Sequence, residues 1–248
     1  MTILLICSSL AVGVLFGATG VGGVLLIPAL MFFGGLTTHQ AMATALASFF
    51  FLGIAASWIY YRHGSFDFPM AVPVLLGSLV SAYAGAYVGA LAPARFLDLF
   101  LAAVIIMSSL YAVLPLQFVS LADRLSQRGN TALLFTIGVF TGFICGMTGA
   151  GGGIVSIPVM LLCGYATLPT IAAAQLLHIF IPLSGSISNF SNDFIVFQTL
   201  WWVTLCELAG TAVGCRIAHS VPLDGLKRWV TLFCLGLGVF MAAKTFFS

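Results

Sequence analysis

A glycine-rich segment occurs twice in the chain, at residues 17–23 and again at residues 146–153, and a proline follows each copy. Glycine permits positive φ angles and a close approach of the backbone to a ligand. Where such a segment interrupts a helix, the freed N–H groups and a helix dipole of about +0.5 charge attract an anion. The two segments therefore predict an anion-binding site built mainly from backbone, without buried Lys or Arg.

The residues predicted to bind the anion are the glycines of both copies and the hydroxyl side chains beside them. Helix packing through small residues is the alternative interpretation of the glycines, but paired breaks in two repeats favour a binding site. Pro28 and Pro158, which lack a backbone donor, can kink the helix beyond each copy. The predicted set is Thr19, Gly20, Gly22, Gly23, Thr148, Gly149, Gly151, Gly152, Gly153 and Ser156.

A line of polar side chains lies inside one apolar segment of the second half. Gln175, His178 and Asn189 fall on one helical face, together with Pro182 and Ser186, at spacings of 3, 4, 4 and 3 residues. Polar side chains within an apolar span should face protein or water. We add Gln175, His178 and Asn189 to the substrate-binding set, with hydrogen bonds between helices as the alternative for Gln175 and Asn189.

Two titratable residues lie deep inside apolar segments. Glu207 is the only acid well inside such a segment, and His178 is the only histidine clearly inside one. Ionisable groups at such positions commonly mark ion pathways or proton relays. We expect Glu207 and His178 to serve ion coupling. The alternatives are a protonated Glu207 bonded to a backbone carbonyl and a neutral, hydrogen-bonded His178.

Composition assigns the chain to the integral membrane proteins. Of its 248 residues, 61% are hydrophobic and 6% are charged, whereas about a quarter of the residues of a soluble protein are charged. The formal net charge of +2 comes from few residues, and no basic run could neutralise phosphates. We therefore expect an all-α polytopic protein with the lipid bilayer as a partner and no nucleic acid.

The elements that carry the glycine segments repeat along the chain. At an offset of 129 or 130 residues, Gly13 corresponds to Gly142, and Gly85 corresponds to Gly214. We predict a first transmembrane repeat (1–116), a linker loop (117–130) and a second transmembrane repeat (131–248). Each repeat contains four apolar segments, at about 2–33, 41–60, 69–91 and 95–116, and at about 132–163, 169–190, 195–219 and 225–247.

The first segment of each half is too long for one crossing. Thirty or so helical residues span roughly 45 Å, whereas the hydrocarbon core is about 30 Å thick. If these segments are re-entrant, the halves are inverted and six of the eight Lys and Arg residues share one side. If all eight segments cross in parallel repeats, the split is four to four. The expected cytoplasmic excess favours the inverted arrangement, with both termini extracytoplasmic.

The paired motifs resemble those of the TauE/SafE-type sulfite and organosulfonate exporters. The resemblance lies in Gly20-Val-Gly-Gly23 and Gly149-Ala-Gly-Gly-Gly153, each followed by a proline, within two four-segment halves, and it covers essentially the whole chain. It implies a substrate such as sulfite, thiosulfate or a sulfonate. The first copy departs from the pattern, since Val24 stands where the second has Gly153.

Together these features predict a secondary transporter that moves a small sulfur-containing anion by alternating access, coupled to protons. Transport of another small organic anion and a non-transporting membrane subunit are the alternatives. No HExxH, GxSxG or carboxylate cluster is present, so we expect no enzyme activity, cofactor or metal ion. The expected location is the inner membrane of a prokaryote, and the sequence is compatible with a homo-oligomer.

Overall fold

The computed structural model describes residues 3–113, 125–190 and 193–220, together with positions 236, 239 and 242. The side chains of residues 22, 108–113 and 187–190 lie outside that description. Most of the predicted linker and of the predicted segment 225–247 also lies outside it. The described residues form helices, turns and loops and contain no strand.

The helices follow the predicted segments closely. The first half contains α1 (Ile3–Thr19), the 3₁₀ turn η1 (Gly22–Leu25), α2 (Leu26–Phe32), α3 (Thr38–Arg62), α4 (Phe68–Leu91) and α5 (Ala94–Val113). The second half contains α7 (Gln127–Thr148), α8 (Gly153–Leu162), α9 (Thr167–Phe190) and α10 (Phe197–Ser220). Since α7 begins at Gln127, the helix starts within the predicted linker.

Polar residues set the starts of three helices. A capping box joins Thr37 and Gln40 at the start of α3, and Asp67 and Ser126 accept backbone N–H groups at the starts of α4 and α7. Such caps satisfy donors that have no partner within the helix. The helices therefore begin at polar residues that border the apolar stretches.

Within the described residues, four helices are long and apolar enough to cross a membrane: Thr38–Arg62, Phe68–Leu91, Gln127–Thr148 and Thr167–Ser186. Their outer surfaces are apolar: Trp58 is 61% exposed and Val80 75% exposed. Contact of such side chains with lipid is favourable, whereas their contact with water is costly. The architecture is that of an all-helical integral membrane protein.

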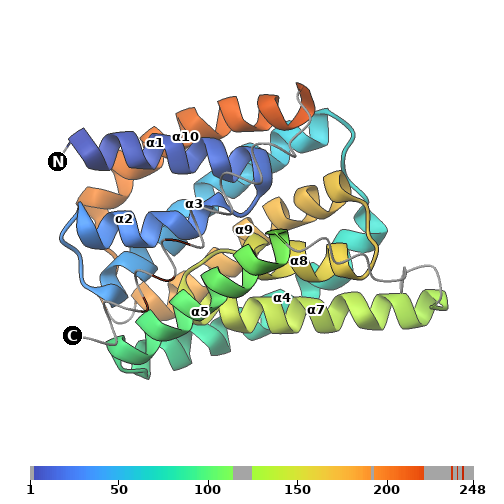
Figure 1. Ribbon diagram of the computed structural model, residues 1–248. Helices are drawn as coiled ribbons and strands as arrows, with labels where there is room; N and C mark the ends of the chain where they lie inside the picture. Colours follow the sequence, from blue (N-terminus) through green and yellow to red (C-terminus); the bar gives the residue numbers. More distant parts are fainter. Residues whose placement is uncertain are drawn as a thin grey trace.

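The chain reverses at both glycine segments. In Figure 1, α1 runs inward from the N-terminus, and α2 returns to the same side, where the chain turns into α3. The second pair does the same from the opposite side: α7 runs inward, α8 runs back, and the chain turns into α9. The two reversal points lie in the interior of the bundle.

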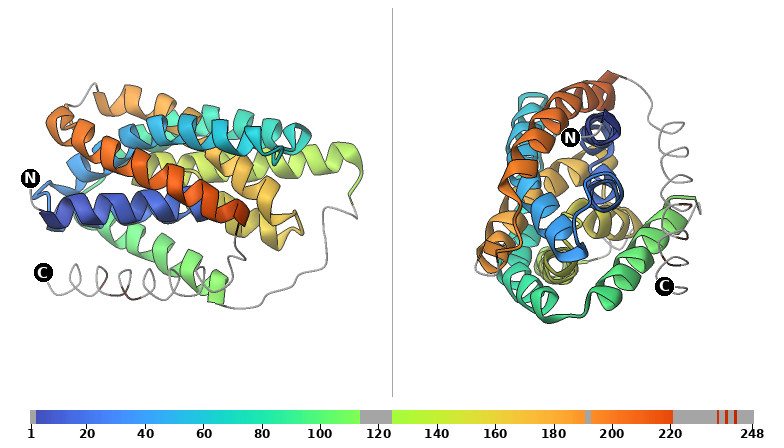
Figure 2. Two further views of the ribbon diagram at one scale, coloured as in Figure 1. Left: turned by 90° about the horizontal axis from the view of Figure 1, so that it is seen from above. Right: turned by 90° about the vertical axis from the view of Figure 1, so that its left-hand side faces the viewer.

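Glycines allow two helix pairs to pack backbone against backbone. In Figure 2, α1 lies alongside α10, and a Cβ atom on Gly13 would stand 2.2 Å from the carbonyl oxygen of Glu207. Helix α7 approaches α4 as closely, because a Cβ on Gly142 would stand 2.4 Å from the carbonyl oxygen of Ser78. No larger residue fits these positions without separating the helices.

Candidate functional site

The first break follows directly from the end of α1. Gly20 adopts φ +71°, a conformation that side-chain-bearing residues rarely take, and its N–H donates to the carbonyl of Phe16 at 2.9 Å. The Thr19 hydroxyl donates to the carbonyl of Leu15 at 2.8 Å and accepts the N–H of Val21 at 3.3 Å. These bonds end the helix and turn the chain.

The second break uses the same bonds. Gly149 adopts φ +68° at the end of α7. The Thr148 hydroxyl donates to the carbonyl of Ile144 at 2.9 Å and accepts the N–H of Ala150 at 3.4 Å. A second positive φ, of +76°, follows at Gly151. In this conformation both threonine hydroxyls therefore bond to their own backbone, as does Ser156, which donates to the carbonyl of Gly152 at 2.8 Å.

The two breaks touch each other. A Cβ atom on Gly153 would stand 1.8 Å from the carbonyl oxygen of Gly20, so the two backbones are in contact. For the N–H groups of Gly151, Gly152 and Ile154, the described part of the chain supplies no hydrogen-bond acceptor. Buried N–H groups are nearly always paired. The start of α8 is therefore a cluster of donors beside the first break.

His178 of α9 lies against this cluster of donors. Its Nε2 lies 3.5 Å from the backbone nitrogen of Gly153, and its Nδ1 lies 2.6 Å from the carbonyl oxygen of Ala174. The ring contacts Phe16 edge-on, with centroids 4.5 Å apart. His178 is 1% exposed. The predicted mid-segment histidine thus lies at the second break.

Gln175 reaches the first break from the same face of α9. Its Nε2 donates to the carbonyl of Phe16 at 3.2 Å, and its Oε1 is buried without a hydrogen-bond partner among the described residues. The structure thus brings Gln175 and His178 to the two breaks. The side chain of Asn189, the third predicted polar residue of this face, lies outside the described residues.

Glu207 lies on α10, away from the breaks. Its backbone abuts Gly13, the side chain is completely buried, and neither carboxyl oxygen has a hydrogen-bond partner in the part of the chain that the structure describes. The nearby Ser48 hydroxyl donates instead to the carbonyl of Ala45, at 2.8 Å. Glu207 therefore lies where α10 meets α1 and α3.

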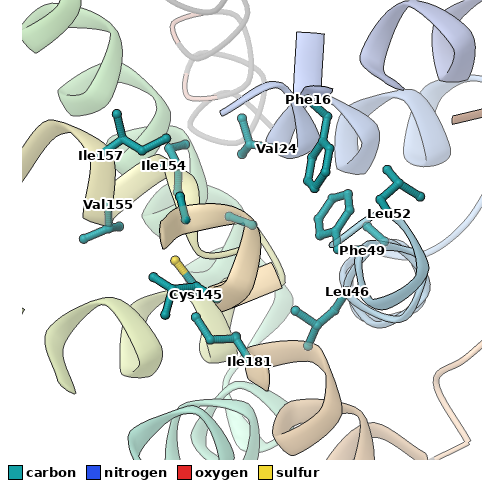
Figure 3. Packing of buried hydrophobic residues seen from close by; sticks show 14 of the residues in the cluster. Phe16, Val24, Leu46, Phe49, Leu52, Cys145, Ile154, Val155, Ile157 and Ile181 are labelled. Atoms are coloured by element: carbon teal, nitrogen blue, oxygen red, sulfur yellow. The ribbon is translucent and has the colours of Figure 1, made fainter. Parts of the chain in front are cut away.

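Three aromatic residues complete the site, and the motifs did not indicate them. Phe16 and Phe49 stack with centroids 5.7 Å apart, and Figure 3 shows their rings side by side between α1 and α3. Tyr60 donates its hydroxyl to the carbonyl of Gly17 at 3.0 Å, and so pairs a carbonyl at the end of α1. The chain contains 22 phenylalanines, so the sequence alone does not indicate which of them line a site.

The breaks are enclosed in this conformation. A cavity of about 10 Å³ reaches Gly149 between α3, α4 and α7, and this volume holds at most about one water molecule. Phe16 of α1 and Phe49 of α3, both 0% exposed, cover the place where the two breaks meet. This cavity is too small for a substrate in the present conformation.

Comparison with known proteins assigns the chain to a family. A sequence model described as Sulfite exporter TauE/SafE matches residues 4–244. This chain belongs to the TauE/SafE family. Among curated proteins, it is 23% identical over 235 residues to the probable membrane transporter protein YdhB of Bacillus subtilis (strain 168), an alignment that covers 92% of this chain and 95% of that protein. No solved structure shows a significant match.

Two further relatives carry similar names. The probable membrane transporter protein YunE of Bacillus subtilis (strain 168) is 22% identical over 242 residues, which is 88% of each chain. The probable membrane transporter protein ORF9 of a Sinorhizobium species is 28% identical over 113 residues, which is 46% of this chain and 43% of that protein. TauE/SafE membership and the apolar helices together make this chain an integral membrane transporter rather than an enzyme.

Proposed function

We propose that this protein is a secondary transporter that carries a small sulfur-containing anion, such as sulfite, thiosulfate or a sulfonate, by alternating access. The observation that carries the proposal is the contact between two glycine breaks in the core, beside N–H groups at the start of α8 for which the described residues offer no acceptor. Backbone donors at a helix N-terminus bind oxyanions without a buried cation. Helix breaks at the interface between repeats are the usual substrate sites of transporters.

Contacts between helices support two homologous halves related by inversion. The contact of Gly13 with the backbone of Glu207 has a counterpart in the contact of Gly142 with the backbone of Ser78, and both residues are shifted by 129 positions. The same offset relates Gly17 on Thr211 to Gly146 on Ala82, and Gly214 on Val14 to Gly85 on Phe143, each of them a contact with a backbone carbonyl oxygen. In each case the first helix of one half packs on the third segment of the other. The opposed hairpins in Figure 1 also favour this arrangement.

The distribution of Arg side chains supports placing the C-terminal end of α3 on the cytoplasmic side of the membrane. Arg62 is the last residue of α3. Helix α10, which contains Arg216, ends beside it, because the rings of His63 and His219 stack with their centroids 4.1 Å apart. Arg128 lines a surface cleft with the start of α4, while Arg95 lies at the opposite end, in the first turn of α5. Three of the four Lys and Arg side chains that the structure describes therefore share one end, as the positive-inside rule favours.

The two buried titratable residues fit a role in coupling. Under this proposal Glu207 and His178 exchange protons with the two sides as the site alternates its access. Neither residue has a titratable counterpart in the other half: Glu207 corresponds to Ser78 at the offset of 129 residues. A group that the repeated scaffold does not require is a candidate for a function that only one half performs.

The re-entrant arrangement predicts which positions share a face of the membrane. Single cysteines replacing Ile3, Thr37 and His63 in a cysteine-free protein should divide into two groups. Those at Ile3 and Thr37 should react with a membrane-impermeant thiol reagent from the extracytoplasmic face, and that at His63 from the cytoplasmic face. Labelling of Ile3 and Thr37 from opposite faces would establish eight full spans in parallel repeats instead.

Flux measurements test the function itself. In liposomes containing the purified protein, we expect sulfite, thiosulfate and a small sulfonate to move faster than chloride or a short carboxylate, because tetrahedral or pyramidal oxyanions can accept several N–H groups at once. Equal or faster movement of the carboxylate would favour a different organic anion. Absence of flux for every anion would support a non-transporting membrane subunit.

A further inference from the structure

His178 is enclosed by the two breaks and by aromatic rings. A Cβ atom on Gly151 would stand 2.7 Å from Nε2, and one on Gly153 would stand 3.2 Å from Cε1. The rings of Phe16 and Phe49 meet the imidazole edge-on, with centroids 4.5 Å and 6.0 Å away. The imidazole therefore fills the space in front of the first turn of α8.

The two ring nitrogens have different partners, and these partners define the state of the ring. Nδ1 faces the carbonyl oxygen of Ala174 at 2.6 Å, which can only accept, so Nδ1 carries a proton. Nε2 faces the N–H of Gly153 at 3.5 Å, which can only donate, so Nε2 offers a lone pair. Both bonds together require a neutral imidazole in its Nδ1–H tautomer.

We propose that, in this conformation, neutral His178 takes the place of the transported anion at the start of α8. The inference rests on the proposed function and specifies how its site is regulated. A proton taken from solution by Nε2 removes the lone pair, so the Gly153 N–H loses its acceptor and becomes available to an anion oxygen. The new Nε2–H is a charged donor that can bond to the same anion. Each anion seated at α8 is thus accompanied by one proton on His178.

Other titratable groups are separated from the imidazole. In the part of the chain that the structure describes, the neighbouring helices contribute the buried Cys145 of α7, Tyr60 of α3, and Glu207 and Cys215 of α10. Tyr60 donates to the carbonyl of Gly17, and Glu207 lies beside Gly13 and Ser48. Apart from the Ala174 carbonyl at Nδ1, the ring contacts phenylalanine side chains and glycine backbone. Glu207 is therefore the residue that the experiment must separate from His178.

The pH dependence of anion binding tests the inference. Thiosulfate serves as the probe because it stays fully ionised, unlike sulfite, between about pH 5 and pH 8, the range in which imidazole changes charge. For the full chain in lipid nanodiscs, calorimetry should show Kd decreasing as the pH falls, by up to about tenfold per pH unit, as one bound proton requires.

His178→Gln is the decisive variant. The Gln carbonyl can accept the Gly153 N–H as Nε2 does, but it cannot be protonated. We expect His178→Gln to keep the native elution profile, to bind thiosulfate as weakly as the parent does at high pH, and to show no pH dependence. A pH dependence that is lost in Glu207→Gln and kept in His178→Gln would assign the bound proton to Glu207 and overturn the inference. A pH slope that persists in His178→Gln would overturn the inference and leave the proposed function intact.

A second measurement does not depend on any anion. In the substrate-free protein at about pH 8, the ¹⁵N chemical shifts of His178 should identify a neutral ring protonated at Nδ1. A ring protonated at Nε2 would overturn the inference. If no sulfur oxyanion binds to the parent protein at any pH, the proposed function fails, and the inference about its site fails with it.

Discussion

Gly153→Ala should abolish transport. The added Cβ would stand 1.8 Å from the carbonyl oxygen of Gly20. The backbone fixes the positions of both atoms, so no side-chain rotation can relieve the clash. The substitution must therefore push the two breaks apart. Misplacement by about 1 Å at a site of this kind can cost roughly a hundredfold in rate. We expect the initial rate of anion uptake into liposomes to fall by at least that factor.

Gly129→Ala is the matched control for this substitution. Gly129 lies in the first turn of α7, and a Cβ there would meet its nearest neighbour at 3.4 Å, an ordinary contact. We expect parental uptake from this variant at equal protein in the liposomes. Elution profiles of both variants separate a lost site from a lost fold. Near-parental uptake by correctly folded Gly153→Ala would show that transport does not need the contact between the breaks.

Glu207→Gln should separate anion binding from coupling to protons. A carboxylate without donors is costly to bury, and neither oxygen of Glu207 has a partner among the described residues. We therefore expect the carboxyl group to carry its proton in this conformation. Gln has the same shape but no proton to release. The variant should bind thiosulfate within about twofold of the parent, yet lose uptake driven by a pH gradient alone.

Asp67→Asn is the control for loss of a carboxyl group. Asp67 caps α4 by accepting the N–H of Met70 at 3.2 Å, and Asn caps a helix about as well. Its proton-driven uptake should remain parental. If Glu207→Gln still concentrates thiosulfate when only a proton gradient is supplied, Glu207 has no part in coupling.

The helices were predictable because their signals are local. Apolar stretches indicated α3 and α4 to within a few residues, and Thr37 and Asp67 mark where those helices begin. The glycine segments indicated where α1 and α7 end. The pairing of α1 with α10 was not predictable from one sequence, because an apolar helix face does not specify which other face it contacts. That pairing depends on how Gly13 and Gly17 fit particular backbone carbonyls.

The candidate site was predictable in part. The positions of His178 and Gln175 within an apolar segment indicated residues that avoid lipid, and both lie at the breaks. Their hydrogen-bond partners were not predictable, because these belong to distant segments. The threonines illustrate the same limit: their position at the turn was indicated, but only the geometry shows that each hydroxyl bonds to its own helix.

The packing of α1 on α10 also sets an order of events during synthesis. Helix α1 leaves the ribosome well before its partner α10, which begins at Phe197. Until α10 is made, Gly13 and Gly17 lack the backbone carbonyls that they contact in the folded protein. The packing face of α1 must therefore contact lipid or other segments until α10 is translated. The contact between α1 and α10 can thus form only after every helix between them has been made.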